Sequence, residues 1–440
     1  MNKINSDHQI FFGCSDFSGL FRGRAISSKD YLNKIPTGCG WVPADQSLTP
    51  FGEIGPNNPF GSTGDLRLIP DKSAEYKINK KELGSPFHFF ISDIKTLDGN
   101  PWECCARNYL KQGIKKLYDF YGIKLMVGFE HEFTIIDHDE IPEPVFSMRA
   151  FRKEAQFIDT LACYMSEANI GVDNYLPEYG INQFEIPTSP KLALKAADDA
   201  VALREILKEV ARHCEKKISL SPKISPNSVG NGVHIHLSLL DKNNRDISQD
   251  IKNKGKLGKD FSSFCAGILN HINCVTTLSA PSTVSYLRLL PHNWSASYNT
   301  ISMQDREAAI RLCPEFYFNR KKIGSFHAEI RVGDATSSPY LHLGSIIHAG
   351  LIGLENKLKI KNLTSKDPSL MKEKEQKKLG IKRLPKSLNE AINSLSSDKI
   401  FKKSAGKLFW DCYEDMRKTE LKMTKKMTKI EICKAFNSVF

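Results

Sequence analysis

The stretch GFEHEFTIID, residues 128–137, places two carboxylates inside an apolar run. Phe129 and Phe133 flank them, and the run predicts a strand that enters a core. Side chains two residues apart on a strand point to the same face, so Glu130 and Glu132 are expected side by side. Like charges that close repel each other unless a positive group lies between them. The stretch therefore raises the question of which cation the protein holds at this point.

The length and composition are those of a large soluble protein. The 440 residues are enough for two or three structural units, and a chain that is 40% hydrophobic and 25% charged is typical of globular proteins. No apolar run reaches the roughly 18 residues that a membrane helix needs, and the N-terminal MNKINSDHQIFF does not resemble a signal peptide. The 11 cysteines include no Cys-x-x-Cys motif and are expected as reduced thiols, which predicts a cytoplasmic protein.

The formal charge of +12 lies at one end of the chain. Residues 356–440 contain 22 Lys+Arg and 10 Asp+Glu, so the other residues balance at 40 of each. This basic part lacks interleaved aromatic residues and any recognition motif, so it predicts a solvated lysine-rich helical surface rather than a nucleic-acid partner. Such a surface could still attract anionic metabolites weakly.

The order of the expected elements indicates an α+β fold. Residues 1–100 contain short apolar runs separated by turn signals, with a long loop over 50–64. A helix is expected to begin at Pro101, and we place a domain boundary just before it. Strands and helices then follow each other irregularly through residues 101–440, of which 356–440 is a basic, helical closing segment. Irregular order favours α+β over a doubly wound sheet.

Three other places repeat the pattern of polar side chains in apolar strand contexts. They are His234 and His236 in GVHIHLS, Glu178 and Glu185 in EYGINQFE, and Glu329 and Arg331 in FHAEIRV. Any one of them alone is more simply a solvent-facing carboxylate or a hydrogen-bonded buried His. Five carboxylates with one or two imidazoles, however, are costly to bury together without a cation. Oxygen-rich ligation without a thiolate favours Mg²⁺ or Mn²⁺ over zinc, and this many ligands suits two ions.

Arginines are concentrated downstream of these groups, at Arg288, Arg306, Arg311 and Arg331. Arginine is the side chain best suited to bidentate binding of carboxylates and phosphates. The sequence has no Walker-type Gly-rich loop. Two hard cations with several arginines therefore predict a nucleotide whose phosphates are held by metal and guanidinium groups.

The motifs, taken in order, resemble those of the glutamine synthetase family. They are E-x-E, E-x-x-x-x-Q-x-E, G-x-H-x-H, Y-x-R-L-x-P, R-x-x-x-x-R and E-x-R, and six ordered motifs are far more specific than one. The resemblance runs from about Asp16 to the C-terminus, where LPKSLNEAI is similar to the family's closing segment. It implies an N-terminal β-grasp domain, here residues 1–100, and a catalytic domain, here 101–440, with a curved antiparallel sheet flanked by helices.

The resemblance also implies roles for the residues that match the motifs. The ligands of two Mg²⁺ or Mn²⁺ ions are Glu132, Glu178 and Glu185 for one ion and Glu130, His234 and Glu329 for the other. The groups that contact ATP are His236, Arg306 and Arg311, and the expected catalytic groups are Arg306, Arg311 and Glu329. The positions that bind glutamate are Gly230, Arg288 and Arg331.

The implied activity is that of an ATP-dependent ligase. In the family, the γ-carboxylate of L-glutamate attacks ATP to give γ-glutamyl phosphate, and an amine then displaces phosphate. The N-terminal domain completes the active site of a neighbouring subunit, so a homo-oligomeric, dodecamer-like ring is implied. The residues agree with this chemistry, because phosphoryl transfer depends mainly on positioning and charge neutralisation.

Three positions depart from the family pattern. Trp294, in RLLPHNWSAS, stands where glutamine-forming members carry a Glu that helps to deprotonate ammonium. An indole there is either a packed loop side chain or the wall of a pocket for an amine larger than ammonia. His327 replaces an Arg that contacts phosphate, and Val229 replaces an Asn near glutamate. We therefore expect an intact catalytic core with ammonia or, slightly preferred, an organic amine as the acceptor.

Other classes of function are alternatives at this point. One is a non-catalytic sensor that binds glutamate or nucleotide, although a pure binder does not need two metal sites. Another is a cupin-like metalloenzyme, which would use His-x-His with a Glu but needs a further His, and His327 and His342 are poorly spaced for it. Nucleic-acid binding through the basic end is the weakest of them.

Overall fold

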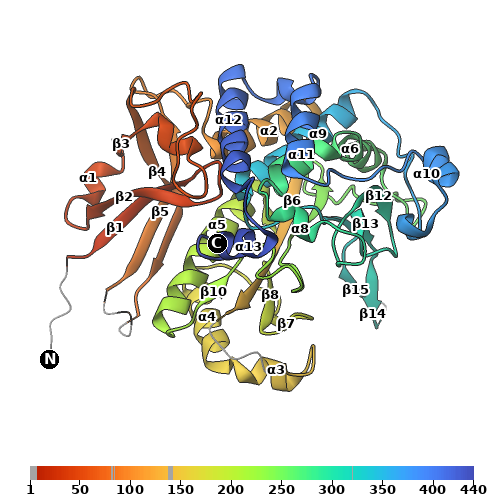
Figure 1. Cartoon of the computed structure of the whole chain (residues 1–440), viewed down its shortest axis with the longest axis horizontal. Helices are drawn as coiled ribbons and strands as arrows, with labels where there is room; N and C mark the ends of the chain where they lie inside the picture. Colours follow the sequence, from red (N-terminus) through yellow and green to blue (C-terminus); the bar gives the residue numbers. More distant parts are fainter. Residues whose placement is uncertain (1–6, 81–82, 84, 137–141, 320) are drawn as a thin grey trace.

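Within its described residues the chain forms a five-stranded sheet, a nine-stranded sheet and a two-stranded pair, and helices pack against the nine-stranded sheet (Figure 1). The computed structural model describes residues 7–80, 83, 85–136, 142–319 and 321–440. The sheet nearest the N-terminus, red to orange in the figure, lies beside a larger body built by the rest of the chain. The predicted α+β class is confirmed.

The N-terminal sheet has the strand order β2-β1-β5-β4-β3. Its elements are β1 (Gln9–Ser15), β2 (Phe21–Ser27), α1 (Tyr31–Lys34), β3 (Cys39–Trp41), β4 (Leu66–Ile78) and β5 (Phe87–Lys95). β1 and β5 pair in parallel, whereas the other neighbouring strands pair antiparallel.

The larger sheet has nine strands, in the order β12-β13-β16-β11-β6-β8-β7, with β9 and β10 also paired to β6. Its strands are β6 (Lys124–Ile135), β7 (Leu176–Pro177), β8 (Gln183–Pro187), β9 (Lys191–Leu192), β10 (Ile218–Ser219), β11 (Val233–Leu240), β12 (Tyr298–Ser302), β13 (Ala308–Cys313) and β16 (His327–Ile330). A separate pair, β14 (Phe316–Phe318) and β15 (Lys321–Gly324), extends from it. Residues 128–135 of the quoted stretch therefore lie on β6, which pairs with β8, β9, β10 and β11.

Helices cover the apolar face of this sheet and build the C-terminal part of the chain. They are α2 (Ala106–Tyr121), α3 (Met148–Lys153), α4 (Ala155–Glu167), α5 (Ala193–His213), α6 (Lys259–Asn270), α7 (Ile272–Ser279), α8 (Ser285–Arg288), α9 (Pro339–Glu355), α10 (Glu373–Leu379), α11 (Leu388–Ser397), α12 (Lys407–Thr424) and α13 (Lys429–Asn437). His131, between the two glutamates of the quoted stretch, shows how they pack. His131 points to the helical side, where Arg204 of α5 donates to its ring at 3.0 Å. Phe129 lies on the same side, with the His342 ring of α9 6.3 Å away.

A buried arginine joins the N-terminal sheet to the larger body. Arg107 of α2 donates to both carboxylate oxygens of Asp198 on α5, at 2.9 and 2.7 Å. It also reaches Asp93 on β5 and Asp71 on β4, each at 2.9 Å. Arg107 and Asp198 are only 2% exposed, whereas the side chains of Asp71 and Asp93 are 25% and 23% exposed. Removing Arg107 would therefore leave the Asp198 carboxylate buried without its cation.

The expected start of α2 was wrong by five residues. Pro101 forms an isolated bridge with Lys95, and the backbone N–H of Cys105 closes a turn on the carbonyl of Trp102 at 3.1 Å. Trp102 is buried, so packing of its ring keeps this segment out of the helix until Ala106. Among the described residues, no helix has both the length and the apolar character that crossing a membrane requires.

Candidate active site

One face of the larger sheet carries most of the predicted site residues. Antiparallel partners point to the same face of a sheet, and so do residues two apart on one strand. The register pairs on this face are Glu130 with His234, Glu132 with Glu185, and Glu329 with both His236 and Arg311. Ile235, Ile330 and Phe129 alternate with them and are fully buried on the helical side. The strand register therefore gathers charges from β6, β8, β11, β13 and β16 on one surface.

Glu130 is held between the two histidines of β11. Its Oε1 lies 2.8 Å from Nδ1 of His234, and its Oε2 lies 3.0 Å from Nε2 of His236. Burial opposes ionisation of Glu130, but the two imidazoles outweigh it and lower its pKa well below the ordinary value. Burial likewise opposes protonation of His236, but hydrogen bonds to Cys313 and Glu130 raise its pKa to about 10. The first carboxylate of the quoted stretch is thus balanced by imidazoles.

Glu329 is surrounded by positive groups. Its Oε2 accepts from Arg311 at 2.9 Å, and its Oε1 is paired with the guanidinium of Arg331. His234 Nδ1 lies 3.5 Å from the same Oε1. Burial raises the pKa of Glu329, but Arg331 and the histidines bring it down to about 2. An arginine expected to bind glutamate therefore lies against an expected metal ligand.

Glu132 has different partners from Glu130. Its Oε2 accepts from the backbone N–H of Gly232 at 2.8 Å and from the side-chain amide of Gln183 at 3.3 Å. Gln183 also donates to the Gly230 carbonyl at 2.9 Å. These donors are neutral, so they hold the Glu132 carboxylate in place without balancing its negative charge.

Glu178 and Glu185 lie beside Glu132 and are under electrostatic strain. Burial, together with the negative charge of Glu132, raises the pKa of Glu178 to about 7. Burial and the charges of Glu130 and Glu132 raise the pKa of Glu185 to about 10. A divalent cation would relieve this repulsion, and carboxylate oxygens are the ligands that Mg²⁺ and Mn²⁺ prefer. The donor set therefore fits a hard divalent ion.

A cavity of about 240 Å³ lies over this polar face. Every predicted site residue except His236 lines it: Glu130, Glu132, Glu178, Glu185, Gly230, His234, Arg288, Trp294, Arg306, Arg311, Glu329 and Arg331. Gly230 packs against the stem of Arg288, and a Cβ there would come within 2.5 Å of that side chain. Arg288 in turn donates to the carbonyls of Val332 and Gly333 at 3.1 and 2.6 Å, which fixes its position at the cavity wall.

Three aromatic rings stand at the mouth of this cavity. The ring centroid of Trp294 lies 6.3 Å from that of Tyr179, which lies 6.5 Å from that of Phe146. All three line the cavity, and all three are at least half exposed, Trp294 to 56%. Glu307 anchors the Trp294 loop by accepting from the backbone N–H groups of Trp294 and His292, at 2.8 and 2.9 Å. The indole is therefore fixed at its backbone while its ring stays accessible.

His236 lines a second cavity, of about 550 Å³, on the other side of Glu130. Glu130, Leu176 and Glu185 line both cavities, so the two spaces meet at the carboxylates. His327 also lines the second cavity, and its Nε2 lies 3.0 Å from Nδ1 of His236. The sequence indicated a metal-binding role for His327 only as a poorly spaced further ligand of a cupin-like site, and its position beside His236 follows from the pairing of β11 with β16.

Several residues of the site were not identified from the sequence. Gln183 lies inside the E-x-x-x-x-Q-x-E motif, but the motif alone assigns it no role. The strand register pairs it with Thr134, beside the acidic face. Cys313 faces His327 across the β13–β16 register, which no local pattern reveals. Phe146 and Tyr179 lie outside the strands that surround the site, and nothing in their sequence neighbourhood marks them as neighbours of Trp294.

Two family models together match nearly the whole chain. One, described as the glutamine synthetase N-terminal domain, matches residues 2–102. The other, described as the glutamine synthetase catalytic domain, matches residues 103–435. These matches include all of the strands and helices that build the two cavities.

Named relatives and a solved structure agree with these matches. A gamma-glutamylpolyamine synthetase of Streptomyces coelicolor is 26% identical over 92% of this chain and 87% of its own length. A glutamine synthetase of Pyrococcus abyssi is 31% identical over 73% of this chain and 72% of its own. A crystal structure described as a novel glutamine synthase homolog superposes with a TM-score of 0.91 at 32% identity, covering 100% of both chains. The predicted family and enzyme class are confirmed: the chain belongs to the glutamine synthetase family and is an ATP-dependent ligase that joins glutamate to an amine.

Proposed function

We propose that the acceptor is an organic amine rather than ammonia, and that the residues around the first cavity carry the roles assigned above. The observation that carries this proposal is the exposed ring of Trp294 at the cavity mouth, flanked by Tyr179. The ring is not buried by its own loop, and it lines the cavity that holds the site. Aromatic faces attract alkylammonium groups both by apolar contact and through the ring quadrupole.

The two cavities divide the substrates between them. Glutamate occupies the first cavity, where Arg288 and Arg331 bind its carboxylates and the backbone at Gly230 lies beside it. The phosphates of ATP extend from the second cavity, where His236 contacts them, toward Arg306 and Arg311. The reacting γ-carboxylate and γ-phosphate then meet near Glu130 and Glu185, which line both spaces.

Members of the family generally use ATP and divalent metals, and the acidic face fits two such ions. Glu132, Glu178 and Glu185 would hold one ion, and Glu130, His234 and Glu329 the other. When bound, Mg²⁺ or Mn²⁺ would neutralise phosphate charge and orient the phosphoryl group. The unpartnered Nε2 of the buried His234 supports this assignment, because a buried imidazole nitrogen without a hydrogen bond has room for another ligand.

Arginine side chains would balance negative charge on the substrates during phosphoryl transfer. Arg311 and Arg331 are now paired with Glu329, so substrate binding would exchange these ion pairs for contacts to phosphate and carboxylate. Glutamate and ATP are both anionic, and the exchange keeps each guanidinium next to a negative group.

We also propose that the chain acts as a homo-oligomeric ring in the cytoplasm. All described residues that line the first cavity fall between 130 and 331, and none comes from the N-terminal sheet. That leaves one side of the site for the N-terminal domain of a neighbouring subunit. The 11 free thiols favour a reducing compartment.

A phosphate-release assay with L-glutamate, ATP and Mg²⁺ tests the proposal across ammonia, methylamine, ethanolamine and polyamines. We expect kcat/KM to be higher for at least one organic amine than for ammonia. If ammonia is the best acceptor, the acceptor assignment is wrong. If no amine supports phosphate release in protein that binds ATP, the ligase assignment itself fails.

A further inference from the structure

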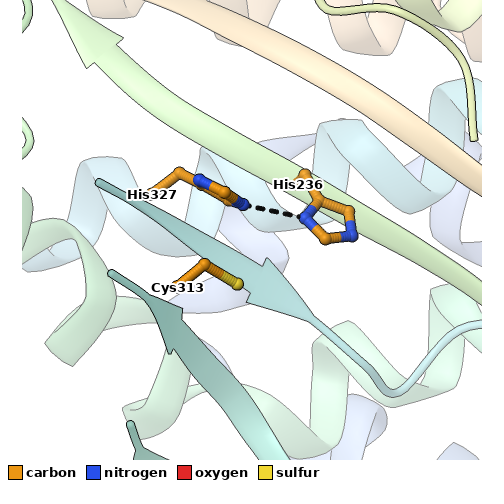
Figure 2. Close-up of side chains that lie close together, drawn as sticks. All are labelled: His236, Cys313 and His327. Carbon is orange, nitrogen blue, oxygen red and sulfur yellow. Dashed lines mark hydrogen bonds between the residues drawn. The ribbon is translucent and has the colours of Figure 1, made fainter. Parts of the chain in front are cut away.

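Three side chains with nitrogen and sulfur donors converge beside the acidic site (Figure 2). His236, Cys313 and His327 come from β11, β13 and β16, which are consecutive neighbours in the sheet. Cys313 on β13 and His327 on β16 are direct register partners. His236 on β11 pairs with Glu329, so it lies diagonal to His327 on the neighbouring strand. One donor atom from each lies within 4.8 Å of the other two.

The hydrogen bonds of the two imidazoles leave their facing nitrogens as acceptors. Nε2 of His236 lies 3.0 Å from the Glu130 carboxylate, and Nδ1 of His327 lies 2.8 Å from the carbonyl oxygen of Ser325. Carboxylate and carbonyl oxygens only accept, so each of these ring nitrogens must carry a proton. In the neutral rings, Nδ1 of His236 and Nε2 of His327 then present lone pairs to each other across 3.0 Å. Something positive must lie between them, either a proton or a metal ion.

The same arrangement is found around histidines that bind metals. A ligating His usually donates its other N–H to a carboxylate or a backbone carbonyl, which fixes the ring and its tautomer. Here one ring has the carboxylate and the other has the carbonyl. On a tetrahedral zinc ion with Zn–N bonds of about 2.0–2.1 Å, two ligating nitrogens lie about 3.3 Å apart. The observed 3.0 Å needs only a small movement to reach that spacing.

We propose that His236, Cys313 and His327 form a binding site for a thiophilic divalent ion, with Zn²⁺ as the expected occupant. Two imidazoles and a thiolate suit Zn²⁺, whereas the neighbouring carboxylates suit Mg²⁺ or Mn²⁺, so ligand chemistry separates the two kinds of site. On binding, Cys313 loses its proton to solvent and its sulfur joins the ion. Both histidines line the second cavity, so an ion bound by them would be accessible from it.

Occupation of this site would inhibit the ligase, and this consequence rests on the proposed function. His236 is expected to contact ATP phosphates, and an ion at its Nδ1 would fix the ring away from that role. The ion would also stand at the wall of the cavity assigned to ATP. Micromolar Zn²⁺ would then reduce turnover even when Mg²⁺ is present in large excess.

Cobalt spectroscopy on the full chain tests the binding site without any enzyme assay. Protein held in excess Mg²⁺, without nucleotide, is titrated with Co²⁺. We expect one Co²⁺ per chain with a thiolate-to-cobalt charge-transfer band, which Zn²⁺ then abolishes by displacement. Cys313→Ser should remove the band, and His327→Gln should weaken binding at least about 100-fold, since loss of even an outer partner costs about 10–100-fold. Cys163→Ser, at an exposed thiol on α4, is the matched control and should keep the band.

Two results would overturn the site. One is a wild-type protein that shows no charge-transfer band, and the other is a band that survives in Cys313→Ser. Inhibition is read separately, as the Zn²⁺ concentration that halves phosphate release relative to each variant's own rate. We expect that concentration to rise at least about 10-fold in Cys313→Ser. If it does not change while the band is lost, zinc inhibits elsewhere and the inhibitory role is wrong.

Discussion

Glu130 and Glu132 project from the same face of β6, yet they share no hydrogen-bond partner. Glu130 is bound by the imidazoles of His234 and His236, whereas Glu132 accepts from a backbone N–H and an amide. Imidazole neighbours thus balance Glu130, whereas the hydrogen-bond donors of Glu132 are neutral. Burial and the negative charges of Glu130 and Glu132 raise the pKa of Glu178 and of Glu185. A divalent cation bound here would lower both pKa values, because it favours the ionised carboxylates.

Glu132→Ala should abolish turnover while leaving the fold intact. Glu132 is expected to ligate an ion together with Glu178 and Glu185, and its loss removes one of three protein ligands. We expect kcat/KM to fall at least about 100-fold at a fixed Mg²⁺ concentration, with partial recovery as Mg²⁺ is raised. Phosphate release measures this. Glu373→Ala, at a side chain 79% exposed on α10, is the control, and wild-type activity in Glu132→Ala would show that the metal assignment is wrong.

The parts of the site that sequence reasoning found are those that depend on local period. A spacing of two on a strand is enough to place Glu130 with Glu132 and His234 with His236 on one face. Cross-strand register is different, because it depends on how β13 aligns with β16. The pairing of Cys313 with His327 follows from that alignment alone. Local rules therefore predicted the acidic site and missed the thiol beside it.

Tertiary packing also overrode one local signal and imposed one unusual backbone conformation. Pro101 is a good first residue for a helix, but the burial of Trp102 delays α2 to Ala106. Phe146 has a positive φ of 57°, a conformation that a phenylalanine rarely adopts and that its neighbours in sequence do not predict. Such positions are set by contacts between distant segments.

Replacing Arg107 should destabilise the protein strongly. Arg107→Met would leave Asp198 buried without its cation and would remove one hydrogen bond each from Asp71 and Asp93. Asp93 would keep its ion pair with Lys111 at 2.6 Å. Breaking one partner of a buried pair costs about 3–5 kcal/mol, and we expect the free energy of unfolding to fall by that amount in urea titrations. Arg212→Ala, at an exposed ion pair on α5, should cost less than about 1 kcal/mol. Equal losses in the two variants would contradict a structural role for the Arg107 junction.

The stability of the protein should fall between pH 6.5 and 4 in part because of His348. Burial, opposed by a hydrogen bond to the Tyr109 carbonyl, lowers the pKa of His348 to about 4, from about 6.5 for an exposed histidine. Between these values the unfolded chain binds a proton that the folded chain does not, so the free energy of unfolding decreases as pH decreases. The full effect of one such shift is about 3 kcal/mol.

His348→Gln keeps a donor for the Tyr109 carbonyl but does not titrate in this range. We expect its urea midpoint to depend less on pH than that of the wild type between pH 7.5 and 4.5. His292→Gln serves as the control, because the side chain of His292 is 64% exposed. A wild-type pH profile in His348→Gln would mean that other groups account for the acid sensitivity.

The aromatic rings at the cavity mouth should determine which amine is used. Trp294→Glu places a carboxylate where glutamine-forming relatives have one, so we expect the ratio of kcat/KM for ammonia to that for the best organic amine to rise. Trp294→Ala should lower kcat/KM for the organic amine by about 3- to 30-fold, which corresponds to one cation–π contact. Tyr179→Ala should act in the same direction, because the Tyr179 ring neighbours the indole. Phe316→Ala removes a ring that is 58% exposed on β14 and does not line the first cavity, so it should leave the ratio unchanged. Unchanged relative rates in both Trp294 variants would show that the indole does not contact the acceptor.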